Sequence, residues 1–271
     1  MNQQYFDDIA YAMKLKIFEL AHNASPNGVH VGGALSSVEI LVALTEVANL
    51  SGRPDRDRII LSKAHGALSL YTAFWQRGLI NDNDLSEYDH DGASFYAHPN
   101  RDLSKGIEFS GGSLGLGISY AVGQALALKQ SASTASVYCI IGDGELDEGI
   151  VWEALMSDSN FNFGNLTVIV DYNKGQLDGP IEEVMSLGNI ENKFDAFGFI
   201  TYNVNGHNVD ELIQTLARTS SDRPKAIIAD TIKGNGVDFL MGTKESHYTV
   251  ITDKKYNKAV EQIKQAYGYD S

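Results

Sequence analysis

The sequence is poor in cysteine and in basic residues, and it lacks long apolar runs. Its single cysteine, Cys139, excludes an internal disulfide, and we expect it to be a small core residue rather than a nucleophile. The 21 basic and 35 acidic residues give a formal net charge of −14, which disfavours a surface that binds nucleic-acid phosphates. The sequence contains no apolar run of about eighteen residues, so it predicts no membrane span. Residues 1–20 lack the signal-peptide pattern, so we expect a cytoplasmic protein without membrane or nucleic-acid partners.

The remaining composition is that of a globular protein, with 43% hydrophobic residues over 271 positions, and we expect a single domain. From residue 113 onward, helical and strand-like segments alternate. The strand-like runs are apolar on both faces, which is typical of parallel strands covered by helices on both sides. They are residues 135–141, 166–172, 199–206 and 225–232. The predicted fold class is therefore α/β, with a parallel sheet flanked by helices.

Four further segments have the pattern of regular structure before and after this region. They are helices at residues 5–20, 63–78 and 251–271 and a strand at residues 57–62. Ser36 lies three residues before Glu39, a capping-box pattern that predicts the start of another helix. We expect Ala259, Ile263 and Ala266 to form the apolar stripe of the last helix and to pack on the domain.

Asp143 and Asn173 stand at the ends of two strand-like runs. Ligands of parallel sheets collect at the carboxyl ends of the strands, so the two side chains converge if these strands are neighbours. A carboxylate and an amide oxygen suit Mg²⁺, which usually keeps phosphate oxygens among its ligands. Gly142 and Gly144 allow a close approach of the backbone to such a ligand. Although "GDG" alone is an ordinary turn, this context predicts a diphosphate bridged to the protein by Mg²⁺.

The segment "GDGELDEGIVWEAL", followed by Asn173, resembles the thiamine diphosphate signature of the transketolase family. The resemblance implies that Asp143 and Asn173 bind Mg²⁺, or Ca²⁺ or Mn²⁺ in its place. It also implies that the backbone carbonyl of Gly175 is the third protein ligand and that the backbone of Gly144 contacts the diphosphate of thiamine diphosphate.

Three acidic residues follow within the same motif. The resemblance places Glu148 at an interface beside the cofactor, where it supports the site. Glu145 is also expected near the cofactor, and we predict that Glu145 and Asp147 are solvated acids of the first helical turn.

Other segments match family motifs in the same order along the chain, from about residue 10 to residue 250. The segments "GVHVGGALSSVEIL", "LSKAHGALSLY", "YAHPN" and "TIKGNGVDFLMGTKESHYTV" resemble the segments that carry the active-site histidines. They imply catalytic roles for His30, His65, His98 and His247, with His65 also contacting the cofactor. Neutral histidine can accept a proton, and protonated histidine can hydrogen-bond to a developing alkoxide.

The segment "FSGGSLGLGISYAVGQALA" resembles the loop and helix that pack along the diphosphate, which implies contacts from Ser113, Leu114 and Gly115. Four positions depart from the family pattern: Val29, Val31, Leu116 and Tyr248. Because Val29, Val31 and Tyr248 border His30 and His247, they leave the sugar specificity open more than the cofactor site.

The remaining histidines match no active-site motif. We assign no role to His22 or His90. His207 precedes Asn208, which lies three residues before Glu211 and has the pattern of a helix cap. We therefore expect His207 to be structural.

The resemblance covers only the first half of a full-length transketolase. We expect residues 1–271 to form a single diphosphate-binding domain, without the pyrimidine-binding and C-terminal domains. The chain would then be the N-terminal subunit of a split transketolase, active only with a separately encoded partner in an α₂β₂ assembly. The implied reaction transfers a two-carbon ketol unit from a ketose, with a ketose phosphate favoured, to an aldehyde.

Two classes of alternative remain open. The chain could serve another thiamine diphosphate enzyme, such as a deoxyketose-phosphate synthase or the α chain of a 2-oxo acid dehydrogenase. It could also be a non-catalytic diphosphate-binding scaffold, although the sequence lacks the P-loop pattern.

Overall fold

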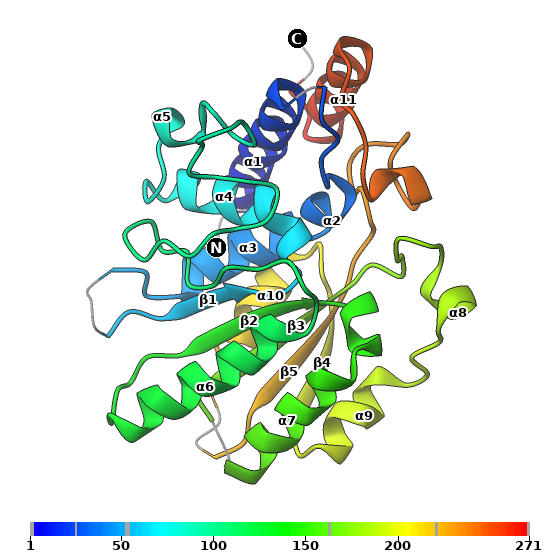
Figure 1. The fold of residues 1–271 in the computed structure, drawn as a ribbon. Coiled ribbons are helices and arrows are strands. Elements are labelled where there is room, and N and C mark those ends of the chain that lie inside the picture. The colour runs from blue at the N-terminus through cyan, green and yellow to red at the C-terminus, as the bar shows by residue number, and fades with distance from the viewer. Residues whose placement is uncertain (1–2, 25, 52–54, 162–163, 220–221, 270–271) are drawn as a thin grey trace.

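A parallel sheet of five strands forms the centre of the molecule (Figure 1). The computed structural model describes residues 3–24, 26–51, 55–161, 164–219 and 222–269. The strand order is β1-β2-β3-β5-β4, and every neighbouring pair is parallel. The strands are β1 Arg58–Leu61, β2 Val137–Gly142, β3 Leu166–Tyr172, β4 Ile200–Asn205 and β5 Lys225–Asp230. The predicted α/β class with a parallel sheet is confirmed.

Helices cover both faces of the sheet, and each face has its own hydrophobic core. One layer contains α1 Gln3–Asn23, α3 Val38–Val47, α4 Ala67–Gln76 and α10 Val209–Leu216, with α11 Asp253–Ala266 packed on α1. The other layer contains α6 Leu116–Gln130, α7 Gly149–Phe161 and α9 Ile190–Ala196 (Figure 1). The short helices are α2 Gly32–Leu35, α5 Asp82–Leu85 and α8 Ile181–Val184.

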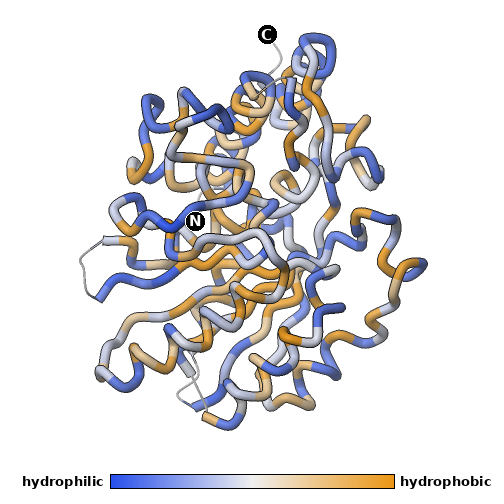
Figure 2. Tube along the Cα trace, in the orientation of Figure 1, coloured by the Kyte–Doolittle hydropathy of each residue, from blue (hydrophilic) through white to orange (hydrophobic). Residues whose placement is uncertain are grey.

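Successive residues of the central strands point into different cores. Cys139 and Val168 belong to the core beneath α6 and α7, whereas Ile140 and Ile169 belong to the core beneath α1, α3 and α4. This alternation is the two-residue period of a β-strand, and it explains why runs apolar at every position form the sheet. Figure 2 shows these hydrophobic strands in the interior and hydrophilic loops around them. Cys139 is fully buried, as predicted.

The predicted capping box is wrong. Helix α3 begins at Val38 after Ser37, and no side chain caps it. The Glu39 carboxylate is buried instead and accepts from Lys14 of α1 at 2.7 Å and from His207 at 2.9 Å. Burial alone would raise the pKa of Glu39, but Lys14 and His207 lower it to about 2. The carboxylate thus makes two charge-assisted hydrogen bonds to distant segments and does not cap the helix.

Other local predictions hold, with one exception. Asn208 caps α10 by accepting from the backbone N–H of Glu211 at 3.1 Å. In α11, Ala259 and Ile263 are buried against the domain, but Ala266 is exposed, so the apolar stripe is shorter than predicted. Residues 270–271, at the end of the predicted helix, lie outside the described residues. No helix in the described ranges is long and apolar enough to cross a membrane.

The strand order positions the candidate site. β2 and β3 are direct neighbours, with Gly142 opposite Asp171. The chain leaves both strands at the same edge of the sheet, so Asp143 and Asn173 emerge side by side, as the sequence predicted. The segments that follow β1 and β5 leave at this edge as well, since all five strands are parallel.

Candidate cofactor and active site

Asp143 directly follows β2 and is 2% exposed. Its two carboxylate oxygens accept from the backbone N–H groups of Gly144, at 2.8 Å, and Lys174, at 2.5 Å. Burial raises the pKa of Asp143 to about 6, the neighbouring Asp171 carboxylate adds to this, and the two hydrogen bonds oppose it. A buried carboxylate in this state is poised to gain stability from a cation.

Asn173 stands two residues beyond Asp171, and its amide has a fixed orientation. Its Nδ2 donates to Asp171 at 3.2 Å, and its Oδ1 accepts from the Gly175 N–H at 3.1 Å. The pKa of Asp171 is lowered, so its carboxylate is ionised and can only accept hydrogen bonds. The NH₂ group of Asn173 therefore faces Asp171, and the amide oxygen is directed away from it.

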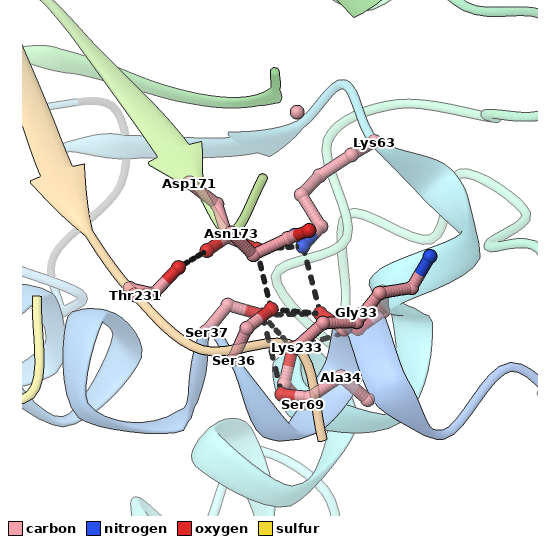
Figure 3. Close-up of polar contacts among 12 residues, drawn as sticks. Gly33, Ala34, Ser36, Ser37, Lys63, Ser69, Asp171, Asn173, Thr231 and Lys233 are labelled. Carbon is pink, nitrogen blue, oxygen red and sulfur yellow. Dashed lines mark hydrogen bonds and ion pairs between the residues drawn. The ribbon is translucent and has the colours of Figure 1, made fainter. Parts of the chain in front are cut away.

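Asp171 is itself the centre of a buried polar network (Figure 3). Three further donors reach its carboxylate from different segments: Ser36 at 2.6 Å, and Lys63 and Thr231 through short hydrogen bonds. Both Lys63 and Asp171 are completely buried. Burial alone would raise the pKa of Asp171, but Lys63 and the two hydroxyl groups hold it below its usual value.

Lys63 also connects the sheet edge to the α2 segment, because its ammonium donates to the Gly33 carbonyl at 2.7 Å. Gly33 has no space for a side chain here. A Cβ atom at this position would lie 3.0 Å from Cδ2 of His65. The network therefore fixes the segment next to His30 relative to the end of β3.

Lys233 lies after β5 and contacts two groups of candidate residues. Its ammonium donates to the carbonyls of Gly175 at 3.1 Å and Gln176 at 3.2 Å, and lies 3.2 Å from Nδ1 of His247. The lysine is 3% exposed, and burial lowers its pKa to about 8. A carbonyl oxygen has two lone pairs, so the Gly175 carbonyl can bind Lys233 and still face a metal.

Glu145 is not the solvated acid that the sequence predicted. It is 1% exposed and accepts from the N–H groups of Gly115 at 2.7 Å and Gly142 at 3.1 Å, and from the Ser62 hydroxyl. These donors compensate for the loss of water around the carboxylate. Glu145 therefore joins the ends of β1 and β2 to the loop before α6. Whether it contacts the cofactor stays a prediction.

The other predicted cofactor residues surround the same edge. Gly115 precedes α6 with a φ of 80°, which favours glycine, and a Cβ atom there would lie 2.3 Å from Ile150. Ser113 is exposed and Leu114 is half-buried. The Gly144 N–H donates to Asp143, so a diphosphate would have to share or replace that contact. Glu148 is exposed, as a residue that faces another chain would be.

The four predicted catalytic histidines come from separate segments and form one cluster. The His30 ring centroid lies 5.9 Å from that of His65, and 5.3 Å from those of His98 and His247. His65 and His247 are also 5.3 Å apart. By contrast, His207 pairs with Glu39, and His22 with Asp253.

His30, His65 and His247 are uncharged near neutral pH. Burial lowers the pKa values of His30 and His247 to about 4 and that of His65 well below its usual value, and nearby histidines and lysines add to each decrease. Neutral imidazole keeps a free nitrogen atom that can accept a hydrogen bond from a hydroxyl group, whereas the lowered pKa makes each of these three rings a weaker base. Nδ1 of His30 is buried without a hydrogen-bond partner in the described part of the chain.

The residues at this edge fit a Mg²⁺-bound diphosphate. One carboxylate, one amide oxygen and one backbone carbonyl are hard oxygen donors that leave positions for water and phosphates. The buried Asp143, with its raised pKa, gains most from a cation. No group of three His, Cys, Asp or Glu side chains within the described ranges could hold a metal. The predicted metal ligands include only one side chain of these four types, the Asp143 carboxylate. The other two are an amide oxygen and a backbone carbonyl.

The sequence analysis missed Lys63, Lys233 and Asp171. Both lysines lie inside quoted motifs, "LSKAHG" and "TIKGNG", and Asp171 stands two residues before Asn173. Lysines are almost never fully buried without a partner, so their burial marks them only once the fold is known. The one available signal was their position next to motif histidines and glycines.

Comparison with known proteins identifies the family. The sequence model described as transketolase, thiamine diphosphate binding domain, matches residues 14–271. The chain is 37% identical to the 6-deoxy-6-sulfo-D-fructose transketolase subunit of a Clostridium species, covering 87% of this chain and 88% of the relative. It is 36% identical to one of the subunits of the apulose-4-phosphate transketolase of Actinobacillus succinogenes, covering 94% of both chains.

Solved transketolases have the same fold. The Campylobacter jejuni enzyme superimposes with a TM-score of 0.89 at 27% identity, covering 100% of this chain and 44% of that one. The Leishmania mexicana enzyme superimposes with a TM-score of 0.87 at 26% identity, covering 98% of this chain and 42% of that one. The chain thus spans less than half the length of these enzymes, which are transferases. The predicted cofactor residues and the histidine cluster lie in one site at the edge of the sheet. The chain belongs to the transketolase family, as a thiamine diphosphate-binding domain.

Proposed function

We propose that the chain is the diphosphate-binding subunit of a split transketolase and transfers a two-carbon ketol unit from a ketose, favoured as its phosphate, to an aldehyde. The observation that carries the proposal is the position of the four-histidine cluster beside the Asp143 and Asn173 edge. Lys233 touches both groups, 3.1 Å from the Gly175 carbonyl and 3.2 Å from His247. A cofactor site and a set of bases thus share one edge of the sheet.

Within this proposal, Asp143, Asn173 and the Gly175 carbonyl hold Mg²⁺, and Asp171 keeps the Asn173 oxygen directed at the metal. When bound, thiamine diphosphate supplies the electron sink that makes the carbon–carbon bond of a ketose cleavable. His30, His65, His98 and His247 orient the sugar hydroxyls and exchange protons with them. His30, His65 and His247 are neutral and can accept hydrogen bonds from those hydroxyls. Lys233 neutralises negative charge between the two groups.

We also propose that residues 1–271 form one domain and need a second chain that carries the pyrimidine-binding domain. Two observations support this: relatives of similar length are named as transketolase subunits, and the solved single-chain enzymes are more than twice as long. An α₂β₂ assembly in the cytoplasm is the arrangement we favour. The named substrates of the relatives, a sulfo-sugar and an apulose phosphate, make a specialised sugar a candidate here.

The proposal is tested by capture and reconstitution. The tagged chain, loaded with thiamine diphosphate and Mg²⁺, should retain a second chain from its host, and the pair should transfer ketol units from ketose phosphates but not react with pyruvate. Each chain alone should be inactive. Full transfer activity of this chain alone would contradict the split enzyme. Pyruvate as the preferred donor would instead favour a deoxyketose-phosphate synthase or dehydrogenase.

A further inference from the structure

Tyr248 stands at the open side of the histidine cluster. Its ring centroid lies 5.0 Å from that of His30 with an interplanar angle of 64°, an edge-to-face contact. The residue follows His247 directly in the sequence, and its side chain is 54% exposed. It is thus an aromatic side chain that touches the cluster and also faces solvent.

The backbone holds Tyr248 in this place. Val29 and Thr249 form an antiparallel bridge, with N–H to carbonyl distances of 2.9 and 3.0 Å in the two directions. Both residues are buried, so the bridge fixes the segments that carry His30 and Tyr248 relative to each other. Tyr248 therefore cannot leave the cluster without breaking two buried hydrogen bonds or rotating its side chain into water.

Gly28 provides the surface on which the ring rests. A Cβ atom at Gly28 would lie 2.3 Å from Cε1 of Tyr248, a distance that no real contact allows. The ring therefore lies directly on the glycine backbone on one side and against His30 on another. The rest of the side chain faces solvent beside the histidine cluster.

We propose that Tyr248 is a specificity-determining residue, the wall of the sugar pocket that limits the length of the aldehyde acceptor and favours short ones. The inference rests on the proposed ketol transfer. A ring in this place beside His30 would obstruct the chain of a five-carbon aldose more than it obstructs a two-carbon aldehyde. Such a steric element discriminates between substrates by exclusion.

The test compares Tyr248→Gly with Tyr248→Phe in the reconstituted pair. The donor is fixed, and kcat/KM is measured for glycolaldehyde and for D-ribose, which both lack phosphate. In Tyr248→Gly the ratio of ribose to glycolaldehyde should rise at least about tenfold, the lower end of what one group in a pocket contributes. In Tyr248→Phe, which keeps the ring, the ratio should stay within about twofold of the native value, well below that range. An unchanged ratio in Tyr248→Gly would overturn the inference.

A second measurement separates this inference from the proposed function. In the chain alone, the NMR signal of the His30 ring should shift in Tyr248→Gly, because the neighbouring ring current is lost, and should hardly change in Tyr248→Phe. No shift in Tyr248→Gly would overturn the contact, whatever the activity. If the native pair transfers no ketol unit to either aldehyde while the shift is seen, the proposed function fails and the contact stands.

Discussion

Two neighbouring groups of side chains at one sheet edge are held in opposite ways. In the group around Asp171, the ionised carboxylate accepts from four donors, one of them the ammonium of Lys63, and both Lys63 and Asp171 are fully buried. The group around His30 consists of histidine rings in mutual contact, with a buried Nδ1 atom that has no partner in the described part of the chain. The first group is complete before any ligand arrives, whereas the second has hydrogen-bonding capacity left for a ligand.

Under the proposed function, this difference corresponds to two roles, cofactor binding beside Asp171 and substrate binding at the histidines. A metal and a diphosphate need donors fixed in advance, because a charged ligand gains most where no reorganisation is required. Groups that bind the hydroxyls of a substrate and exchange protons with them need nitrogen atoms that are free to accept. Variants of either group should therefore fail in different ways, the charged group in stability and cofactor binding and the histidines in turnover.

Removing the charge of Lys63 should produce the largest loss of stability. In Lys63→Met the ionised Asp171 stays buried without its counterion, and such a loss costs about 3–5 kcal/mol. Urea unfolding measures this cost. The exposed pair of Lys174 and Asp230 provides a matched control, because Lys174→Met should cost at most about 1 kcal/mol.

A double variant tests the reason for this loss. Lys63→Met combined with Asp171→Leu removes both charges and should recover part of the stability, because no unpaired charge remains buried. If Lys63→Met costs no more than Lys174→Met, the Asp171 group is not held by its ion pair and the contrast with the histidines fails.

Another buried carboxylate, that of Asp158 in α7, shows the effect of burial without donors. It is 0% exposed, and neither oxygen has a hydrogen-bond partner within the described residues. Burial raises its pKa to about 8, against a smaller opposite effect of Lys129. Asp171, equally buried but with four donors, has a lowered pKa.

The sign of the pH effect follows from the raised pKa. Between about pH 4 and pH 8 the unfolded chain ionises Asp158 while the folded chain keeps it protonated. The group therefore contributes most stability at low pH and loses it as the pH rises, by at most about 1.4 kcal/mol per unit. Urea unfolding at pH 5, 6 and 7 should show a steeper decrease for the native chain than for Asp158→Asn. Parallel decreases would show that Asp158 is not protonated in the fold.

Much of the fold could be predicted because strands apolar at every position specify a sheet covered on both faces. The pairing of β2 with β3 was the condition under which Asp143 and Asn173 were expected to converge, and the structure meets it. Glu39 and Glu145 were misjudged for one reason. Each lies in a segment typical of a solvated helix start, and only tertiary contacts bring the donors that bury it.

The candidate site was predictable where side chains lie in recognisable motifs, as for the four histidines. It was not predictable where a residue acts through distant partners. Asp171 collects donors from Ser36, Lys63 and Thr231, which are 135, 108 and 60 positions away. No local pattern encodes such a convergence, because it depends on the order of the strands.

The proposed cofactor site at Asp143, beside the Asp171 group, and the histidine group can be told apart most directly by a calorimetric titration of thiamine diphosphate, with Mg²⁺, into the chain and its partner. It compares the native chain with Asp143→Ala and His30→Ala. We predict that Asp143→Ala weakens binding by at least about 100-fold, since a group that supports a metal ligand already contributes up to this much. His30→Ala should bind the cofactor as the native chain does and lose turnover only. Native-like binding by Asp143→Ala, or loss of binding by His30→Ala, would contradict the assignment of the two groups.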